Sequence, residues 1–119
     1  MNIIENKAYK KSERKVLKNK TKELEKLDNI KNAIIISSNL HELMLSKFKY
    51  IYDIRKKHGD LKEIYSASLN SNIRLLFKPV GSYPYEEIEI VELEFLEIND
   101  THYKGVRLWM DLDQCLKII

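Results

Sequence analysis

Three side chains able to take part in acid/base chemistry stand together near the end of the chain. His102, Tyr103 and Lys104 offer an imidazole, a phenol and an ammonium in one short segment. Because an imidazole titrates near neutral pH, it can accept or donate a proton there. The plain alternative is that His102 is a surface residue at the end of a strand.

The rest of the sequence lacks the commoner catalytic patterns. It has no phosphate-binding glycine loop, no Cys/His spacing typical of a metal site and no nucleophile elbow. Cys115 is the single cysteine, so it has no partner for an internal disulfide, and we expect a cytoplasmic protein. No apolar run approaches the roughly 20 residues of a membrane helix.

The elements that would position these groups centre on residues 50–77. Two turn signals, His58-Gly59-Asp60 and Asn70-Ser71-Asn72, divide this stretch into three apolar runs. Short turns join antiparallel neighbours, so the pattern predicts a meander. Its first strand is expected from about Tyr50 to Lys56.

Helical sequence precedes the meander. Residues 7–37 contain neither Gly nor Pro, and five apolar residues recur at helical spacing: Leu17, Leu24, Leu27, Ile30 and Ile34. We expect one long helix or two helices joined near Asp28, followed by a short helix capped by Asn39. Residues 2–6 favour a short edge strand.

A long strand is expected over residues 86–99, where Glu and apolar residues alternate. The alternation slips between Ile90 and Val91, which predicts a β-bulge. The order of elements predicts an α+β fold, a small antiparallel sheet with the N-terminal helices on one face and a binding surface on the other. We expect one domain over residues 1–119, with a helical part at about 7–46, the β-meander at about 50–100 and a C-terminal tail at 104–119.

Charge is distributed unevenly along the chain. The net charge is +3, but Lys and Arg predominate over residues 1–85 and Asp and Glu over residues 86–119. The basic part could face a polyanion, or it could simply be a solvated Lys-rich helix surface.

The segment from Gly59 to Phe77 resembles the central block of RelE/HigB-type toxins, in the RelE/ParE superfamily. It shares a Gly-Asp-Leu-Lys turn, a short strand with Ser, an Asn-rich turn and a strand containing Arg-Leu-Leu-Phe. The Asp100-Thr101-His102-Tyr103 ending and the Lys-rich helices before the block also resemble that superfamily. The resemblance covers roughly residues 20–104.

This resemblance implies a toxin of a bacterial type II toxin-antitoxin system, held inactive by a cognate antitoxin protein. Many members are ribosome-dependent endoribonucleases that cut mRNA by attack of a 2′-hydroxyl, with no metal, cofactor or membrane. It implies phosphate and transition-state stabilisation by Arg74, a second cation at Lys62, and acid/base work or base stacking by His102 or Tyr103. The residues expected to bind RNA are Arg55, Lys56, Lys57 and Lys78.

Other interpretations remain open at this point. Arg74 could be an exposed strand residue paired with Glu92 or Glu94, and Lys62 a plain turn lysine. The protein could be a ParE-like toxin that binds DNA gyrase without RNase activity, or a non-enzymatic protein-interaction module on the same fold.

Overall fold

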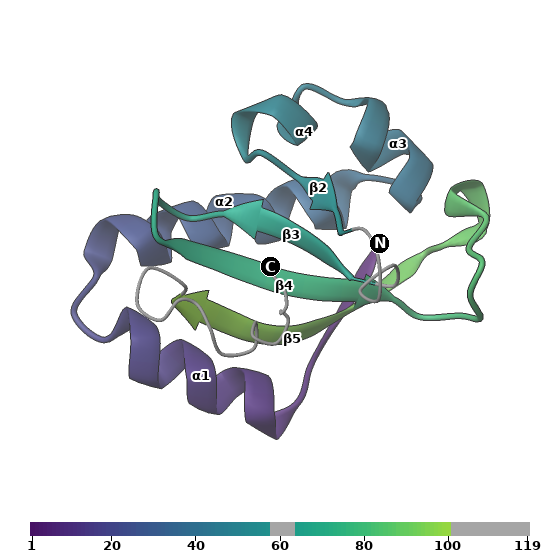
Figure 1. Ribbon diagram of the computed structural model, residues 1–119. Coiled ribbons are helices and arrows are strands. Elements are labelled where there is room, and N and C mark those ends of the chain that lie inside the picture. Colours follow the sequence, from purple (N-terminus) through teal and green to yellow (C-terminus); the bar gives the residue numbers. More distant parts are fainter. Residues whose placement is uncertain (58–63, 101–119) are drawn as a thin grey trace.

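A five-stranded sheet forms the centre of the molecule in the computed structural model, which describes residues 1–57 and 64–100 (Figure 1). The strand order is β1-β5-β4-β3-β2. The strands are β1 (Asn2–Glu5), β2 (Arg55–Lys56), β3 (Tyr65–Ser68), β4 (Ile73–Pro79) and β5 (Glu92–Asp100). Strands β2 to β5 are antiparallel neighbours, which confirms the meander, whereas β1 joins β5 in parallel.

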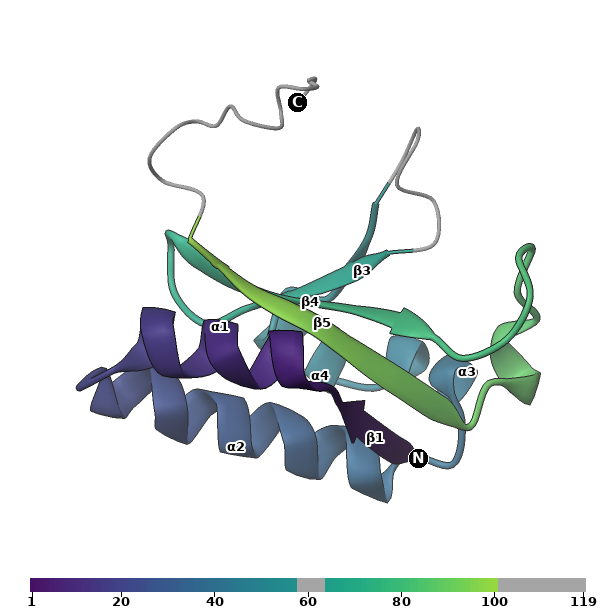
Figure 2. The same ribbon diagram turned by 90° about the horizontal axis from the view of Figure 1, so that it is seen from below.

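Two long helices, α1 (Lys7–Leu17) and α2 (Thr21–Ile36), lie on one face of the sheet (Figure 2). Neither predicted alternative, one long helix or a break near Asp28, is correct, because the chain turns at residues 18–20 and α2 runs through Asp28. Asn19 adopts φ 63°, a left-handed conformation that Asn tolerates better than most residues. The α+β class with helices on one face is confirmed.

Two short helices, α3 (Leu40–Leu45) and α4 (Phe48–Ile51), lie near the β2 edge of the sheet (Figure 1). The Asn39 side chain accepts a hydrogen bond of 2.8 Å from the Glu42 backbone N–H, as the predicted cap requires. The strand expected over residues 50–56 is wrong for most of its length. Residues 48–51 form α4 instead, and β2 contains only Arg55 and Lys56. The helical turn brings the Phe48 and Tyr52 rings, four residues apart, into a stack with centroids 6.1 Å apart.

Aromatic rings connect the helices to the sheet in the core. The Tyr9 ring of α1 packs edge-on against Phe95 of β5 with centroids 5.3 Å apart, and Phe95 contacts Phe77 of β4. Phe77 in turn stacks on Tyr65 of β3. All four side chains are buried, so the face of the sheet toward α1 and α2 is the core face.

The acidic segment begins as a turn of 3-10 helix, η2 (Glu87–Glu89), and not as strand. Ile88 and Val91 are exposed, whereas Ile90 is buried. Ile90 and Val91 both precede β5, which begins at Glu92, so the bulge expected between them is wrong. The register of β4 and β5 shifts further along, where Leu76 pairs with Glu97 but Phe77 pairs with Phe95, so that Leu96 is the extra residue.

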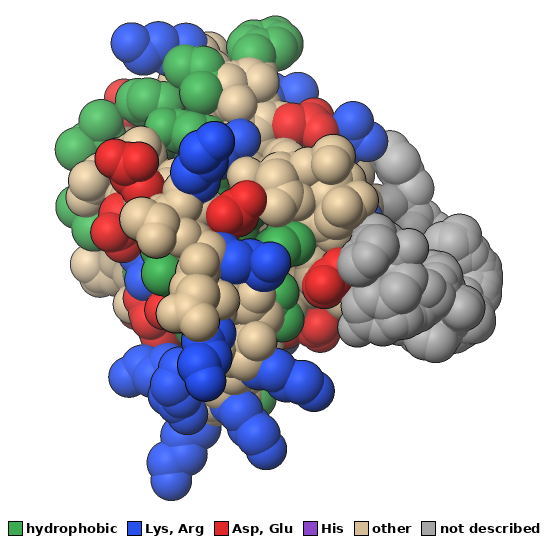
Figure 3. All heavy atoms as spheres, turned by 90° about the vertical axis from the view of Figure 1, so that its left-hand side faces the viewer, with side chains coloured by type: hydrophobic (Ala, Val, Ile, Leu, Met, Phe, Trp, Pro, Cys, Tyr) green, Lys and Arg blue, Asp and Glu red, His purple; other side chains and the backbone are tan. Residues whose placement is uncertain are grey.

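No helix in the described part of the chain combines the length and the apolar character needed to cross a membrane. Lys and Arg side chains gather over the end of the molecule formed by α1 and the start of α2 (Figure 3). Much of the basic surface predicted from the sequence therefore lies on the helices.

Candidate functional site

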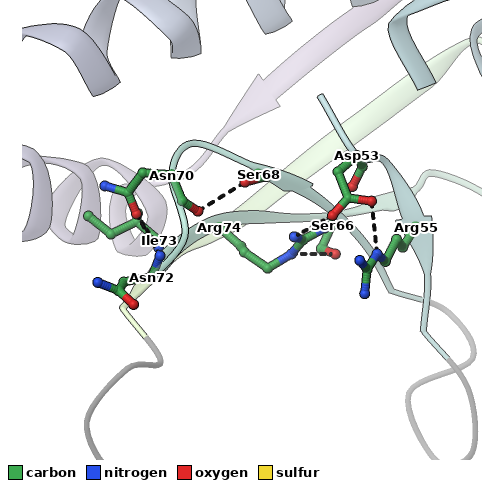
Figure 4. Close-up of polar contacts among 8 residues, drawn as sticks. All are labelled: Asp53, Arg55, Ser66, Ser68, Asn70, Asn72, Ile73 and Arg74. Atoms are coloured by element: carbon green, nitrogen blue, oxygen red, sulfur yellow. Dashed lines mark hydrogen bonds and ion pairs between the residues drawn. The ribbon is translucent and has the colours of Figure 1, made fainter. Parts of the chain in front are cut away.

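Arg74 lies on the sheet face opposite α1 and α2, which we call the open face because, within residues 1–57 and 64–100, no helix covers it (Figure 2). Strand alternation places Ile73, Leu75 and Phe77 in the core and Arg74 on the opposite side. The Arg74 guanidinium extends over β3, where its Nε donates a 3.0 Å hydrogen bond to the buried Ser66 Oγ (Figure 4).

Asp53, which follows α4, holds the other end of the guanidinium. Arg74 Nη1 donates to the carboxylate Oδ2 at 3.2 Å, and Nη2 donates to the backbone oxygen at 2.7 Å. Asp53 has φ 48°, so its carbonyl and its carboxylate both reach the same partner from a tight turn. The Arg74 side chain is 19% exposed and is thus held in one orientation.

Arg55 binds the same carboxylate from β2, with Nε donating to Asp53 Oδ1 at 2.9 Å. The hydrogen bond from Arg55 is the main cause that lowers the pKa of Asp53, and Arg74 adds to it, while partial burial opposes them. Asp53 is therefore an ionised bridge between two arginines.

Lys57 adds a further positive charge to this cluster. Burial lowers the pKa of the Lys57 ammonium, and repulsion from Arg74 and Arg55 lowers it further. Among the described residues that contact or electrostatically influence one another here, Arg55, Lys57 and Arg74 thus supply three cationic side chains and Asp53 one carboxylate. We call these four residues the Arg74 cluster, and its excess positive charge favours an anionic ligand.

The other predicted site residues fall in different places. Lys56 points to the core side, where its Nζ lies 5.8 Å from the centroid of the Tyr65 ring. Lys78 shares the open face but lies opposite Glu94, four residues along β4 from Arg74. Lys62, His102 and Tyr103 lie outside the described residues.

Arg74 does not pair with Glu92 or Glu94, since its ion-pair partner is Asp53 and its β5 neighbour is Asn99. The sequence interpretation missed Asp53 and Ser66 as partners of Arg74, because they come from separate elements. The one usable signal for Asp53 was its residue type, since Asp is among the few residues that tolerate a left-handed turn.

Comparison with known proteins identifies the fold. No family model matches the sequence, and no curated protein matches it. The solved structure of a YoeB/ParE toxin from Agrobacterium tumefaciens superposes with a TM-score of 0.55 at 17% sequence identity, covering 87% of this chain and 100% of that chain. The chain therefore has a RelE/ParE-type toxin fold.

Proposed function

We propose that this protein is the toxin of a type II toxin-antitoxin system and that it cuts mRNA on the ribosome. The observation that carries the proposal is the Arg74 guanidinium, fixed by Ser66 and Asp53 on the open face beside Arg55 and Lys57. The similarity to a YoeB/ParE toxin supports the toxin class. A cognate antitoxin, the ribosome and mRNA are the proposed partners in the cytoplasm.

The reaction needs a positive charge where the phosphorane develops. An RNA 2′-oxygen attacks the adjacent phosphorus as its proton passes to a base, and the bond to the 5′-oxygen breaks as that oxygen takes up a proton. The products are a 2′,3′-cyclic phosphate and a free 5′-hydroxyl. Arg74 would stabilise the added negative charge, because a guanidinium stays ionised and can bind two phosphate oxygens.

Other side chains have supporting roles in this proposal. Arg55 and Lys57 would contact neighbouring phosphates, and Lys62 would add a second cation near the reacting phosphate. His102 or Tyr103 would transfer protons or stack on a base. Lys56 and Lys78, which lie apart from the Arg74 cluster, would contact RNA only outside the reacting phosphate.

One observation favours a binding function without RNase chemistry. All three described hydrogen bonds of the Arg74 guanidinium stay inside the protein, where they fix the turn after α4 to β3 and β4. Arg74 would serve the same structural purpose in a ParE-like gyrase-binding toxin or in a non-enzymatic interaction module.

Induction in growing cells separates these functions. Wild type, Arg74→Lys, Arg74→Ala and His102→Ala are induced while growth and mRNA primer extension are followed. Arg14→Ala, which removes an exposed arginine of α1, is the matched control. We expect growth arrest with ribosome-phased cuts for wild type and Arg14→Ala, and loss of both with either Arg74 variant.

Arrest without cuts that persists in the Arg74 variants contradicts the RNase proposal. Gyrase-dependent DNA damage in those cells supports the ParE-like alternative. Unaffected growth with soluble wild-type protein supports the interaction module.

A further inference from the structure

Asn99 on β5 carries a buried polar atom that has no partner among the residues that the structure describes. The residue is 8% exposed, and its Oδ1 accepts no hydrogen bond from residues 1–57 or 64–100. The amide nitrogen donates to Glu97 Oε2 at 3.0 Å. Because a carboxylate accepts but does not donate, the amide nitrogen must face Glu97, and the orphan atom is the oxygen. An unsatisfied buried acceptor destabilises the folded protein, so it marks a place where a ligand can supply the missing donor.

The position of Asn99 connects this acceptor to the Arg74 cluster. Asn99 lies directly opposite Arg74 in the β4–β5 ladder, while its neighbour Ile98 points into the core. Paired residues of antiparallel strands point to the same face, so Asn99 and Arg74 share the open face. Ser68 of β3 lies opposite Arg74 on its other side.

The ligand that suits both features carries phosphates and hydrogen-bond donors within the span of a nucleotide. The Arg74 cluster attracts the phosphate, and the guanidinium leans over β3, away from β5. A ribose attached to that phosphate or to the next one can extend in the other direction, toward β5. Its 2′-hydroxyl is a donor that DNA lacks, and this group lets a protein distinguish RNA from DNA.

We propose that Asn99 is a binding residue of the open-face site, with Oδ1 accepting a hydrogen bond from a ribose 2′-hydroxyl of bound RNA. The proposal rests on the proposed function, since it assumes that RNA is the ligand. It goes beyond that function by assigning the selection of RNA over DNA to a residue outside the Arg74 cluster.

The test compares two fluorescently labelled single strands of the same sequence, one RNA and one DNA, by anisotropy at low salt. Asn99→Leu keeps the size of the side chain but removes the acceptor. We expect wild type to prefer RNA, and Asn99→Leu to bind RNA about tenfold more weakly with DNA affinity unchanged, the effect of one lost hydrogen bond. Asn99→Leu should also raise the Tm of the free protein, because it removes an unsatisfied buried group.

Two controls guard against misfolding and nonspecific effects. Asn32→Leu changes an exposed asparagine of α2 and should leave both affinities unchanged. Asn99→Ala, checked by circular dichroism and Tm, repeats the test with a smaller side chain. Equal loss of RNA and DNA binding would indicate a damaged fold and contradict the proposal, as would wild type that binds both strands equally or neither.

The outcomes separate this inference from the proposed function. If Arg74→Lys abolishes mRNA cutting while Asn99→Leu leaves RNA affinity and cutting intact, the proposed function stands and the Asn99 proposal fails. If Asn99→Leu removes the RNA preference but no variant changes mRNA cutting, Asn99 recognises RNA and the RNase proposal fails.

Discussion

Arg74 on β4 is joined to Asp53 by two hydrogen bonds, one to the carboxylate and one to the backbone oxygen. The pair fixes the end of α4 to the centre of the sheet, so the geometry of the Arg74 cluster depends on a turn that is distant in sequence.

Replacing Arg74 should therefore lower stability as well as activity. Arg74→Met keeps the aliphatic stem but leaves the buried Ser66 Oγ without its donor. We expect the free energy of unfolding to fall by about 1–3 kcal/mol, measured by urea denaturation. Arg14→Met on α1 is the control and should change it little. Equal stability of the two variants would show that the three hydrogen bonds of Arg74 contribute nothing to the fold.

The carboxylate of Asp53 should make stability depend on acid pH. Hydrogen bonds from Arg55 and then Arg74 hold the pKa of Asp53 below its ordinary value in the folded protein. Its stabilising contribution is thus present above the ordinary aspartate pKa, about 3.9, and is lost as pH falls through the lowered pKa. Asp53→Asn should reduce stability at pH 7 and flatten the loss of stability in acid.

Urea midpoints measured across the acid range test this expectation. Glu25→Gln removes an exposed carboxylate of α2 and controls for the change in net charge. An Asp53→Asn protein with the same acid dependence as wild type would contradict the assignment.

Lys57 should give phosphate binding an unusual dependence on alkaline pH. Burial, with Arg74 and Arg55, lowers the pKa of Lys57, so its charge is lost at lower pH than that of an exposed lysine. Affinity for a single-stranded DNA, a chemically stable probe of phosphate contacts, should fall as pH rises through this lowered pKa. Lys57→Arg should remove the fall, because arginine stays charged.

The salt dependence of the affinity for single-stranded DNA tests the contact between Lys57 and a phosphate in a second way. Lys57→Gln should reduce the slope of log affinity against log salt by about 0.7, the value for one phosphate contact with a single strand. An unchanged slope would mean that Lys57 does not contact the nucleic acid.

Ser12 should contribute to the attachment of α1 to β5. Its Oγ donates to the backbone carbonyl oxygen of Tyr9 at 2.7 Å and accepts from the backbone N–H of Ile98 at 2.9 Å. Strand β1 pairs with β5 only as far as Phe95, so Ser12 supplies the partner that the strand edge lacks at Ile98. Ser12→Ala should lower the free energy of unfolding by about 1–3 kcal/mol. Ser71→Ala in an exposed turn is the control, and similar urea midpoints for the two variants would contradict the bridging role.

The helices and the antiparallel meander followed from apolar periodicity and turn residues, and the structure confirms both. Periodicity failed at residues 50–54, where alternating Tyr and Ile suit a strand but the stacked Phe48 and Tyr52 rings favour a helical turn. Residue type offered Asp28 as a possible helix break, whereas the chain turns at Asn19, which takes the left-handed conformation. Both failures concern where a helix begins or ends, which depends on packing with other elements and not on local sequence alone.

Prediction of the candidate site was limited for the same reason. Arg74 could be selected from its place in a strand motif, but Asp53 and Ser66 become its partners only when β2, β3 and β4 align. Asn99 comes to lie beside Arg74 only through the pairing of β5 with β4, and residue type alone does not reveal that its oxygen lacks a partner among the described residues.

The parallel pairing of β1 with β5 sets a condition on how the chain acquires its structure during synthesis. Strand β1 pairs with residues 92–95 of β5, and the Asn2 N–H donates to the Val91 oxygen, so β1 has no sheet neighbour until about 90 further residues have been made. Contacts between such distant segments form slowly and late. A growing chain that has released only its helices therefore lacks β5, the strand on which α1 packs and the strand that carries Asn99.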